Sequence, residues 1–220
     1  MQRVPEPELM NDFAQARAYA MADFDEPHSQ FIQIFSELFP EKIDSAVLDL
    51  GCGSGDVMVR FANAFPLSRI YGVDGASRML QFAQNRIDHQ MLHERIKLIH
   101  ATLPDVTLPL KTFNTIISNS LLHHVNDPST MWQMVNNHTK SGSRIFIMDL
   151  LRPESVNDAI TIVEQYADGE PDILQRDFYN SLLAAYRVEE VEEQLAKASI
   201  DYLTVKVIGD RHLIISGIRP

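Results

Sequence analysis

The sequence predicts an α/β protein with a mostly parallel sheet, helices on both faces and an antiparallel hairpin at its C-terminal end. Residues 46–50 form a largely apolar run that leads into a glycine-rich turn, as a buried parallel strand does. Strand-like and helix-like segments then alternate up to residue 149, which is typical of βαβ crossovers. Two strand-like runs near the C-terminus are separated only by Gly209 and Asp210, which indicates a hairpin.

Each element follows from a local pattern. Between residues 8 and 39, apolar residues recur at spacings of three and four, so we expect two amphipathic helices. They are separated at Asp25-Glu26-Pro27, because proline suits the first turn of a helix. We expect strands at 46–50, 69–74, 95–99, 113–118 and 143–149, and helices near 55–65, 77–88 and 129–139. Three further helices are expected at about 154–168, 171–185 and 188–198, before the hairpin strands 202–208 and 211–218.

The turn after the first strand carries Gly51, Gly53 and Gly55. A turn that binds a dinucleotide has its third glycine one position later, where this chain has Asp56. The ligand is therefore expected to be a nucleoside without a pyrophosphate. Asp74 ends the second predicted strand, a position that suits an acid binding the two hydroxyls of a ribose.

Four blocks at this spacing resemble the class I S-adenosylmethionine-dependent methyltransferases of the small-molecule type. They are Leu48-Asp49-Leu50-Gly51-Cys52-Gly53-Ser54-Gly55, Tyr71-Gly72-Val73-Asp74 with Ser77-Arg78-Met79-Leu80, the segment 113–125, and the segment 141–149. The resemblance implies a Rossmann-like, seven-stranded sheet and S-adenosylmethionine as the cofactor. The segment 147–153 is loosely similar to the ubiquinone and menaquinone C-methyltransferases. We thus expect one methyltransferase domain, with an N-terminal helical cap (1–44), a cofactor-binding core (45–151), a helical insert or lid (152–199) and a terminal hairpin (200–220).

The resemblance also implies the residues that bind the cofactor. The glycine turn is expected to hold its amino-acid end, Asp49 to orient its methionine part and Asp74 to bind its ribose. The full expected set is Asp49, Gly51, Cys52, Gly53, Gly55, Asp74, Gly75, Met79, Ala101, Thr102, Ser118 and Tyr19. The family often has Gly-Asp-Ala after the third strand, whereas this chain has His100-Ala101-Thr102, so backbone groups there are expected to replace the missing carboxylate.

The expected catalytic residues are His123, His124 and Tyr179. A histidine is the usual general base near neutral pH, although either one could instead cap or pack the following helix. The segment 152–186 follows the fifth strand and is expected to roof the acceptor pocket, with Tyr179 facing it; packing of these helices on the sheet is the alternative. Cys52 is the single cysteine, so no intrachain disulfide and no cysteine-rich zinc site is expected, and we assign no metal.

The amino-acid composition argues against some classes of binding partner. The 220 residues carry 30 acids against 19 bases, a formal net charge of -11, without a basic cluster. Nucleic acid is therefore not the expected acceptor, because its binders show basic faces. With neither a signal sequence nor an apolar run that could span a membrane, a cytoplasmic protein is expected.

The sequence thus predicts methylation of a small molecule. It does not indicate which molecule, which of its atoms accepts the methyl group, or the oligomeric state of the protein. The alternatives are a tRNA-modifying or carboxy-S-adenosylmethionine-type enzyme, and a non-catalytic protein that binds S-adenosylmethionine.

Overall fold

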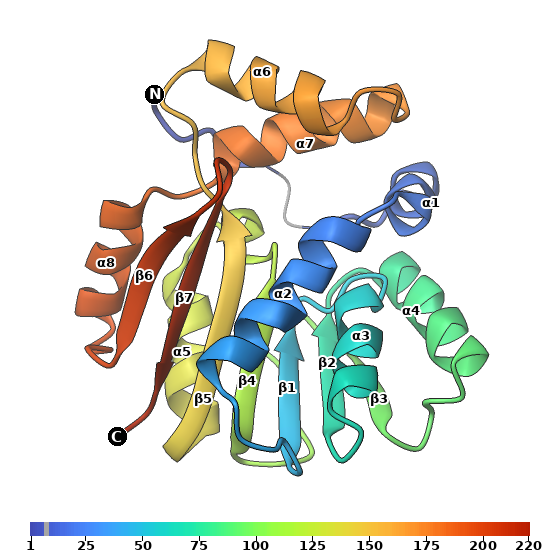
Figure 1. The fold of residues 1–220 in the computed structure, drawn as a ribbon, viewed down its shortest axis with the longest axis vertical. Coiled ribbons are helices and arrows are strands. Elements are labelled where there is room, and N and C mark those ends of the chain that lie inside the picture. Colours follow the sequence, from blue (N-terminus) through green and yellow to red (C-terminus); the bar gives the residue numbers. More distant parts are fainter. Residues whose placement is uncertain (7–8) are drawn as a thin grey trace.

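The computed structural model describes residues 1–6 and 9–220 and contains a seven-stranded sheet (Figure 1). The strand order is β3-β2-β1-β4-β5-β7-β6. Strands β1 to β5 pair in parallel, and β7 is antiparallel to both β5 and β6. This confirms the predicted fold class. The strands are β1 (Ala46–Leu50), β2 (Arg69–Asp74), β3 (Ile96–His100), β4 (Phe113–Asn119), β5 (Thr139–Leu150), β6 (Leu203–Ile208) and β7 (His212–Ile218).

Helices lie on both faces and across one end of the sheet. They are α1 (Phe13–Met21), α2 (Asp25–Leu38), α3 (Asp56–Ala64), α4 (Ser77–His89), α5 (Ser129–His138), α6 (Val156–Tyr166), α7 (Asp172–Ala184) and α8 (Val188–Lys197), with a 3-10 turn, η1 (Leu122–His124). Strand β5 starts four residues before its predicted start at residue 143. The reason is a register shift, in which Phe113 pairs with Thr139 and Thr115 with Arg144.

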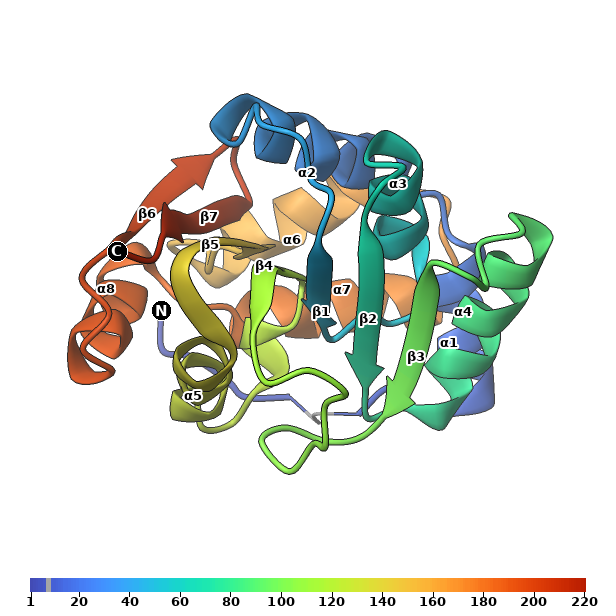
Figure 2. The ribbon, with the colours of Figure 1, turned by 90° about the horizontal axis from the view of Figure 1, so that it is seen from below.

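Two apolar layers hold the sheet between its helices. Helices α2 and α3 cover one face, where Phe31 and Phe35 of α2 pack edge-on against Phe146 of β5. Helices α5 and α8 cover the other face (Figure 2). The Trp132 indole N–H of α5 donates to Gln194 of α8 at 3.0 Å. Helices α6 and α7 cross over the carboxyl ends of the strands, the edge where open α/β sheets bind their ligands (Figure 1).

Asp56, the first residue of α3, ties the N-terminal helices to the core. Its carboxylate lies 2.7 Å from His28 Nδ1 of α2, from Arg60 Nε and from Arg86 Nη1 of α4. Burial opposes ionisation of this carboxyl, but the hydrogen bonds from His28 and Arg60 outweigh it and lower its pKa. Asp56, which stands where the dinucleotide-binding pattern has its third glycine, therefore connects helices α2, α3 and α4. Among the described residues, no helix has both the length and the apolar character needed to cross a bilayer.

Candidate active site

The glycine turn between β1 and α3 has a backbone that side chains rarely adopt. Gly51, Gly53 and Gly55 have φ values of 71°, 52° and 81°. The Gly51 N–H donates to the Val73 carbonyl of β2 at 2.9 Å, which holds the turn against the sheet. A Cβ atom on Gly51 would lie 2.7 Å from Leu121 Cδ1. The turn is thus compatible with glycine alone at Gly51, and it leads directly into the N-terminus of α3, an end of a helix that favours an anionic group.

Asp74 at the end of β2 joins two turns. Its Oδ2 accepts a hydrogen bond from Gly53 N at 2.8 Å and its Oδ1 accepts one from Ala76 N at 2.7 Å. Burial raises the pKa of this carboxyl, and the two backbone hydrogen bonds oppose the rise. Each carboxylate oxygen has a second lone pair, so Asp74 can also accept from a ligand hydroxyl.

A cavity of about 710 Å³ opens over the carboxyl ends of the central strands. It brings together ten of the fifteen residues expected from the sequence: Tyr19, Gly51, Gly53, Asp74, Gly75, Met79, Ala101, Thr102, His123 and His124. The cavity therefore runs from the turn expected to hold the cofactor to the pair expected to act on the acceptor.

Four other expected residues lie behind the cavity wall. The Ser118 hydroxyl donates to the Leu50 carbonyl at 2.7 Å between two strands. Cys52 packs beside Gly72, and burial raises its thiol pKa, which is a property of a structural cysteine. Gly55 caps α3 and faces Ala83 of α4. Asp49 is buried, burial raises its pKa well above the ordinary range, and its Oδ2 has no hydrogen-bond partner among the described residues.

Tyr179, which was expected to face the acceptor pocket, does not line this cavity. Helix α7 lines the cavity with Leu174, Asp177, Phe178 and Ser181, which are spaced three and four residues apart on one helix face. Tyr179 is rotated from that face and packs against the cluster of Leu150 and helices α6 and α7. The expectation that Tyr179 faces the acceptor is therefore not met, because one residue along a helix turns the side chain by about 100°.

His123 is fixed by a carboxylate that no motif assigned to it. Its Nδ1 donates to Asp149 Oδ1 at 2.5 Å, and both side chains are 2% exposed. Asp149 also accepts from the backbone N–H groups of Leu122 and Leu150, each at 2.7 Å. Burial works to lower the pKa of His123, but the charge of Asp149 and its hydrogen bond prevail and raise it. The position of Asp149 at the carboxyl end of a predicted strand was the available signal for this partner.

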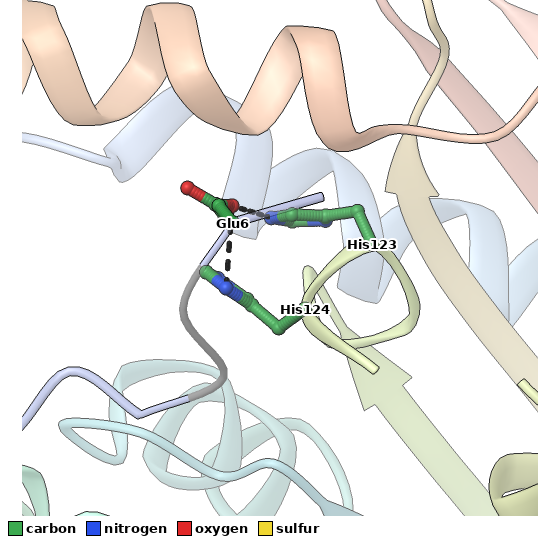
Figure 3. A group of neighbouring side chains, drawn as sticks. All are labelled: Glu6, His123 and His124. Atoms are coloured by element: carbon green, nitrogen blue, oxygen red, sulfur yellow. Dashed lines mark ion pairs between the residues drawn. The ribbon is translucent and has the colours of Figure 1, made fainter. Parts of the chain in front are cut away.

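The N-terminal segment brings a second carboxylate to the histidines. Glu6 Oε1 lies 3.6 Å from His123 Nε2 and 3.2 Å from His124 Nδ1 (Figure 3). Burial raises the pKa of Glu6, while His123 and a 2.8 Å hydrogen bond from Ser181 of α7 oppose the rise. Arg3 anchors the segment, since its guanidinium donates to the carbonyls of His123 and Ala184 at 2.8 and 2.6 Å. Sequence reasoning missed Glu6 because it is far from the pair along the chain.

Comparison with known proteins finds similarity mainly in the part of the chain that holds β1 to β4. A family model described as a methyltransferase domain matches residues 47–142. An uncharacterized methyltransferase of Mycobacterium tuberculosis is 29% identical over 111 residues, 50% of this chain and 53% of that protein. A demethylmenaquinone methyltransferase of a Geobacillus species is 27% identical over 107 residues, 48% of this chain and 45% of that protein. The chain thus spans about half the length of these curated relatives.

The similarity in fold extends over almost the whole chain. A crystal structure of an S-adenosylmethionine-dependent methyltransferase from Aquifex aeolicus matches with a TM-score of 0.69 and 16% sequence identity. The match covers 95% of this chain and 99% of that one. At this identity the match shows a shared fold.

Proposed function

We propose that this chain is a class I S-adenosylmethionine-dependent methyltransferase that transfers the methyl group of S-adenosylmethionine to a small molecule. One observation carries the proposal. A single cavity joins the glycine turn and Asp74 to the buried pair of His123 and Asp149.

The residues around the glycine turn fit the cofactor. Gly51 and Gly53 line the cavity where the amino-acid end of the cofactor would lie, near the N-terminus of α3, which favours a carboxylate. Asp74 accepts hydrogen bonds from the ribose hydroxyls, and Met79 with the backbone of Ala101 and Thr102 borders the adenine. S-adenosylmethionine supplies a methyl group on a positively charged sulfur, which an oxygen, nitrogen or carbon nucleophile attacks in line.

The other end of the cavity orients the acceptor and receives its proton. Phe178 and Leu174 of α7 offer an apolar wall and exclude water. His123 takes up a proton at Nε2, since its Nδ1 is held by Asp149. His124 lies beside it and is more exposed, at 19% against 2% for its neighbour.

The charge of the cavity supports a small acceptor rather than a nucleic acid. Arg211 is the one arginine or lysine among the described lining residues. Acids line the cavity at several places instead: Asp23, Asp25, Glu26, Asp74, Asp127, Glu170 and Asp177. A chain of phosphates would meet repulsion here, because phosphate recognition uses clustered lysine and arginine.

The test is turnover with a set of small acceptors, including phenols, amines and quinols, measured as release of S-adenosylhomocysteine. Release that requires both the acceptor and His123 supports the proposal. Binding of S-adenosylmethionine without release for any acceptor would favour the non-catalytic alternative. Modification of tRNA, or conversion of a carboxylated cofactor, would favour the other alternative.

A further inference from the structure

The cluster of Glu6, His123 and His124 has the donor set of a metal site. One ligand atom from each residue, Glu6 Oε1, His123 Nε2 and His124 Nδ1, lies within 4.8 Å of the other two (Figure 3). The two imidazoles come from the turn after β4, and the carboxylate comes from the N-terminal segment beneath α7. The three side chains point toward one another, although nothing in the chain's local structure requires them to meet.

The two distances from Glu6 to the histidines are close to the donor separations around a tetrahedral metal ion. Donors about 2.0 to 2.1 Å from such an ion lie roughly 3.3 to 3.4 Å apart. Glu6 Oε1 is 3.2 Å from His124 Nδ1 and 3.6 Å from His123 Nε2, values on either side of that separation. At 3.6 Å the second contact is too long for a hydrogen bond, so His123 Nε2 is not engaged by Glu6 in that way.

The residues behind the cluster are those that metal ligands usually have. A ligating histidine commonly donates its other ring N–H to a carboxylate, which fixes the ring and leaves the second nitrogen free to bind a metal. His123 does so toward Asp149, which is held in turn by two backbone N–H groups. The Ser181 hydroxyl donates to Glu6 Oε1 and orients that carboxylate as well.

We propose that Glu6, His123 and His124 bind a divalent transition-metal ion of the Zn²⁺ or Fe²⁺ class at the acceptor end of the cavity. Two imidazoles with one carboxylate suit these ions, whereas Mg²⁺ and Ca²⁺ prefer sites of oxygen donors alone. With three protein ligands the ion keeps an open coordination position, as catalytic sites do.

The open position has a consequence for the acceptor. His123 and His124 both line the cavity, so an oxygen or nitrogen atom of the acceptor can bind the ion there. Such binding makes that atom easier to deprotonate, and His123 then serves as a ligand in place of a base. This role rests on the proposed methyl transfer, whereas the metal site itself does not.

The test uses the full-length protein, freed of its affinity tag and of metal by a chelator, without S-adenosylmethionine. Calorimetric titration with Zn²⁺ should give one site per chain, and Co²⁺ should give a visible spectrum of nitrogen and oxygen ligands. A thiolate charge-transfer band would implicate Cys52 and overturn the proposal, as would the absence of saturable binding.

Variants locate the site. His124→Ala and Glu6→Gln should each weaken Zn²⁺ binding about 100-fold, and Asp149→Asn about 10- to 100-fold. His93→Ala is the matched control, because His93 forms an exposed pair with Glu94 at 3.7 Å and should bind Zn²⁺ like the unchanged protein. His124 is partly exposed, so its variant is expected to fold, which its thermal unfolding checks. Equal affinity of the His124 and His93 variants would contradict the assignment, whatever the outcome of the turnover assay.

Discussion

At the scale of single residues, the buried pair of His123 and Asp149 is the most constrained feature of the site. Asp149 accepts two backbone hydrogen bonds besides that of the imidazole, so its carboxylate cannot turn away. Glu6 faces the other ring nitrogen, and Arg3 lies close enough to oppose protonation of the ring. The pair therefore fixes the orientation of His123 and favours its protonated form.

The pair makes stability depend on pH. The raised pKa of His123 means that its contribution is complete below the ordinary value of 6.5 and is lost as the pH rises through the folded value. The lowered pKa of Asp149 means that its contribution is present above 3.8 and is lost as the pH falls. His123→Gln should thus cost about 3 to 5 kcal/mol of unfolding free energy between these values and less at pH 9. Denaturant unfolding with a chelator present measures this, and an equal cost at both pH values would contradict it.

Substitutions at Gly51 and Gly142 distinguish the stability cost of steric crowding from that of a strained backbone conformation. Both have positive φ, 71° and 80°, but a Cβ atom would meet Leu121 at Gly51 and nothing within 4 Å at Gly142. Gly142→Ala should therefore cost only the left-handed conformation, about 1 to 2 kcal/mol of unfolding free energy. Gly51→Ala should cost about 3 kcal/mol or more, because crowding adds to that strain. Equal losses on thermal unfolding would show that the turn tolerates a side chain.

At the scale of elements, the rotation of helix α7 decides which of its side chains line the cavity. Sequence patterns predicted the helix and its place over the cavity, since a segment that follows a parallel strand lies at the strand's carboxyl end. They did not fix its rotation, because aromatic residues occur on two of its faces. Phe178 lines the cavity and Tyr179 packs against the cluster between α6 and α7.

The two neighbours make a matched test of this rotation. Phe178→Ala should raise the acceptor KM about tenfold, as expected for partial loss of an apolar contact, and leave the affinity for S-adenosylmethionine unchanged. Tyr179→Phe should leave both quantities unchanged. Steady-state kinetics decide the matter, and a lower kcat for Tyr179→Phe alone would restore Tyr179 to the acceptor site.

At the scale of the whole molecule, periodicity and spacing predicted the seven strands and eight α-helices, mostly to within two residues. The strands were readable because the central ones are buried on both faces, and the hairpin because only Gly209 and Asp210 separate its strands. The sequence did not predict contacts between residues that are far apart along the chain. Glu6 reaches His123 through Arg3, which bonds to η1 and to the end of α7, and no local pattern encodes that contact.

The central claim is that this cavity binds S-adenosylmethionine through the glycine turn and Asp74. Calorimetric titration of the unchanged protein, of Asp74→Ala and of Asp88→Ala tests it most directly. Asp88 is an exposed acid on α4 that accepts a hydrogen bond from Gln84, so it controls for the loss of one negative charge. We predict that S-adenosylmethionine binds the unchanged protein and Asp88→Ala alike, and Asp74→Ala more weakly by about 1.5 to 3 kcal/mol. An unchanged dissociation constant for Asp74→Ala, or a preference of the unchanged protein for NAD, would contradict the account.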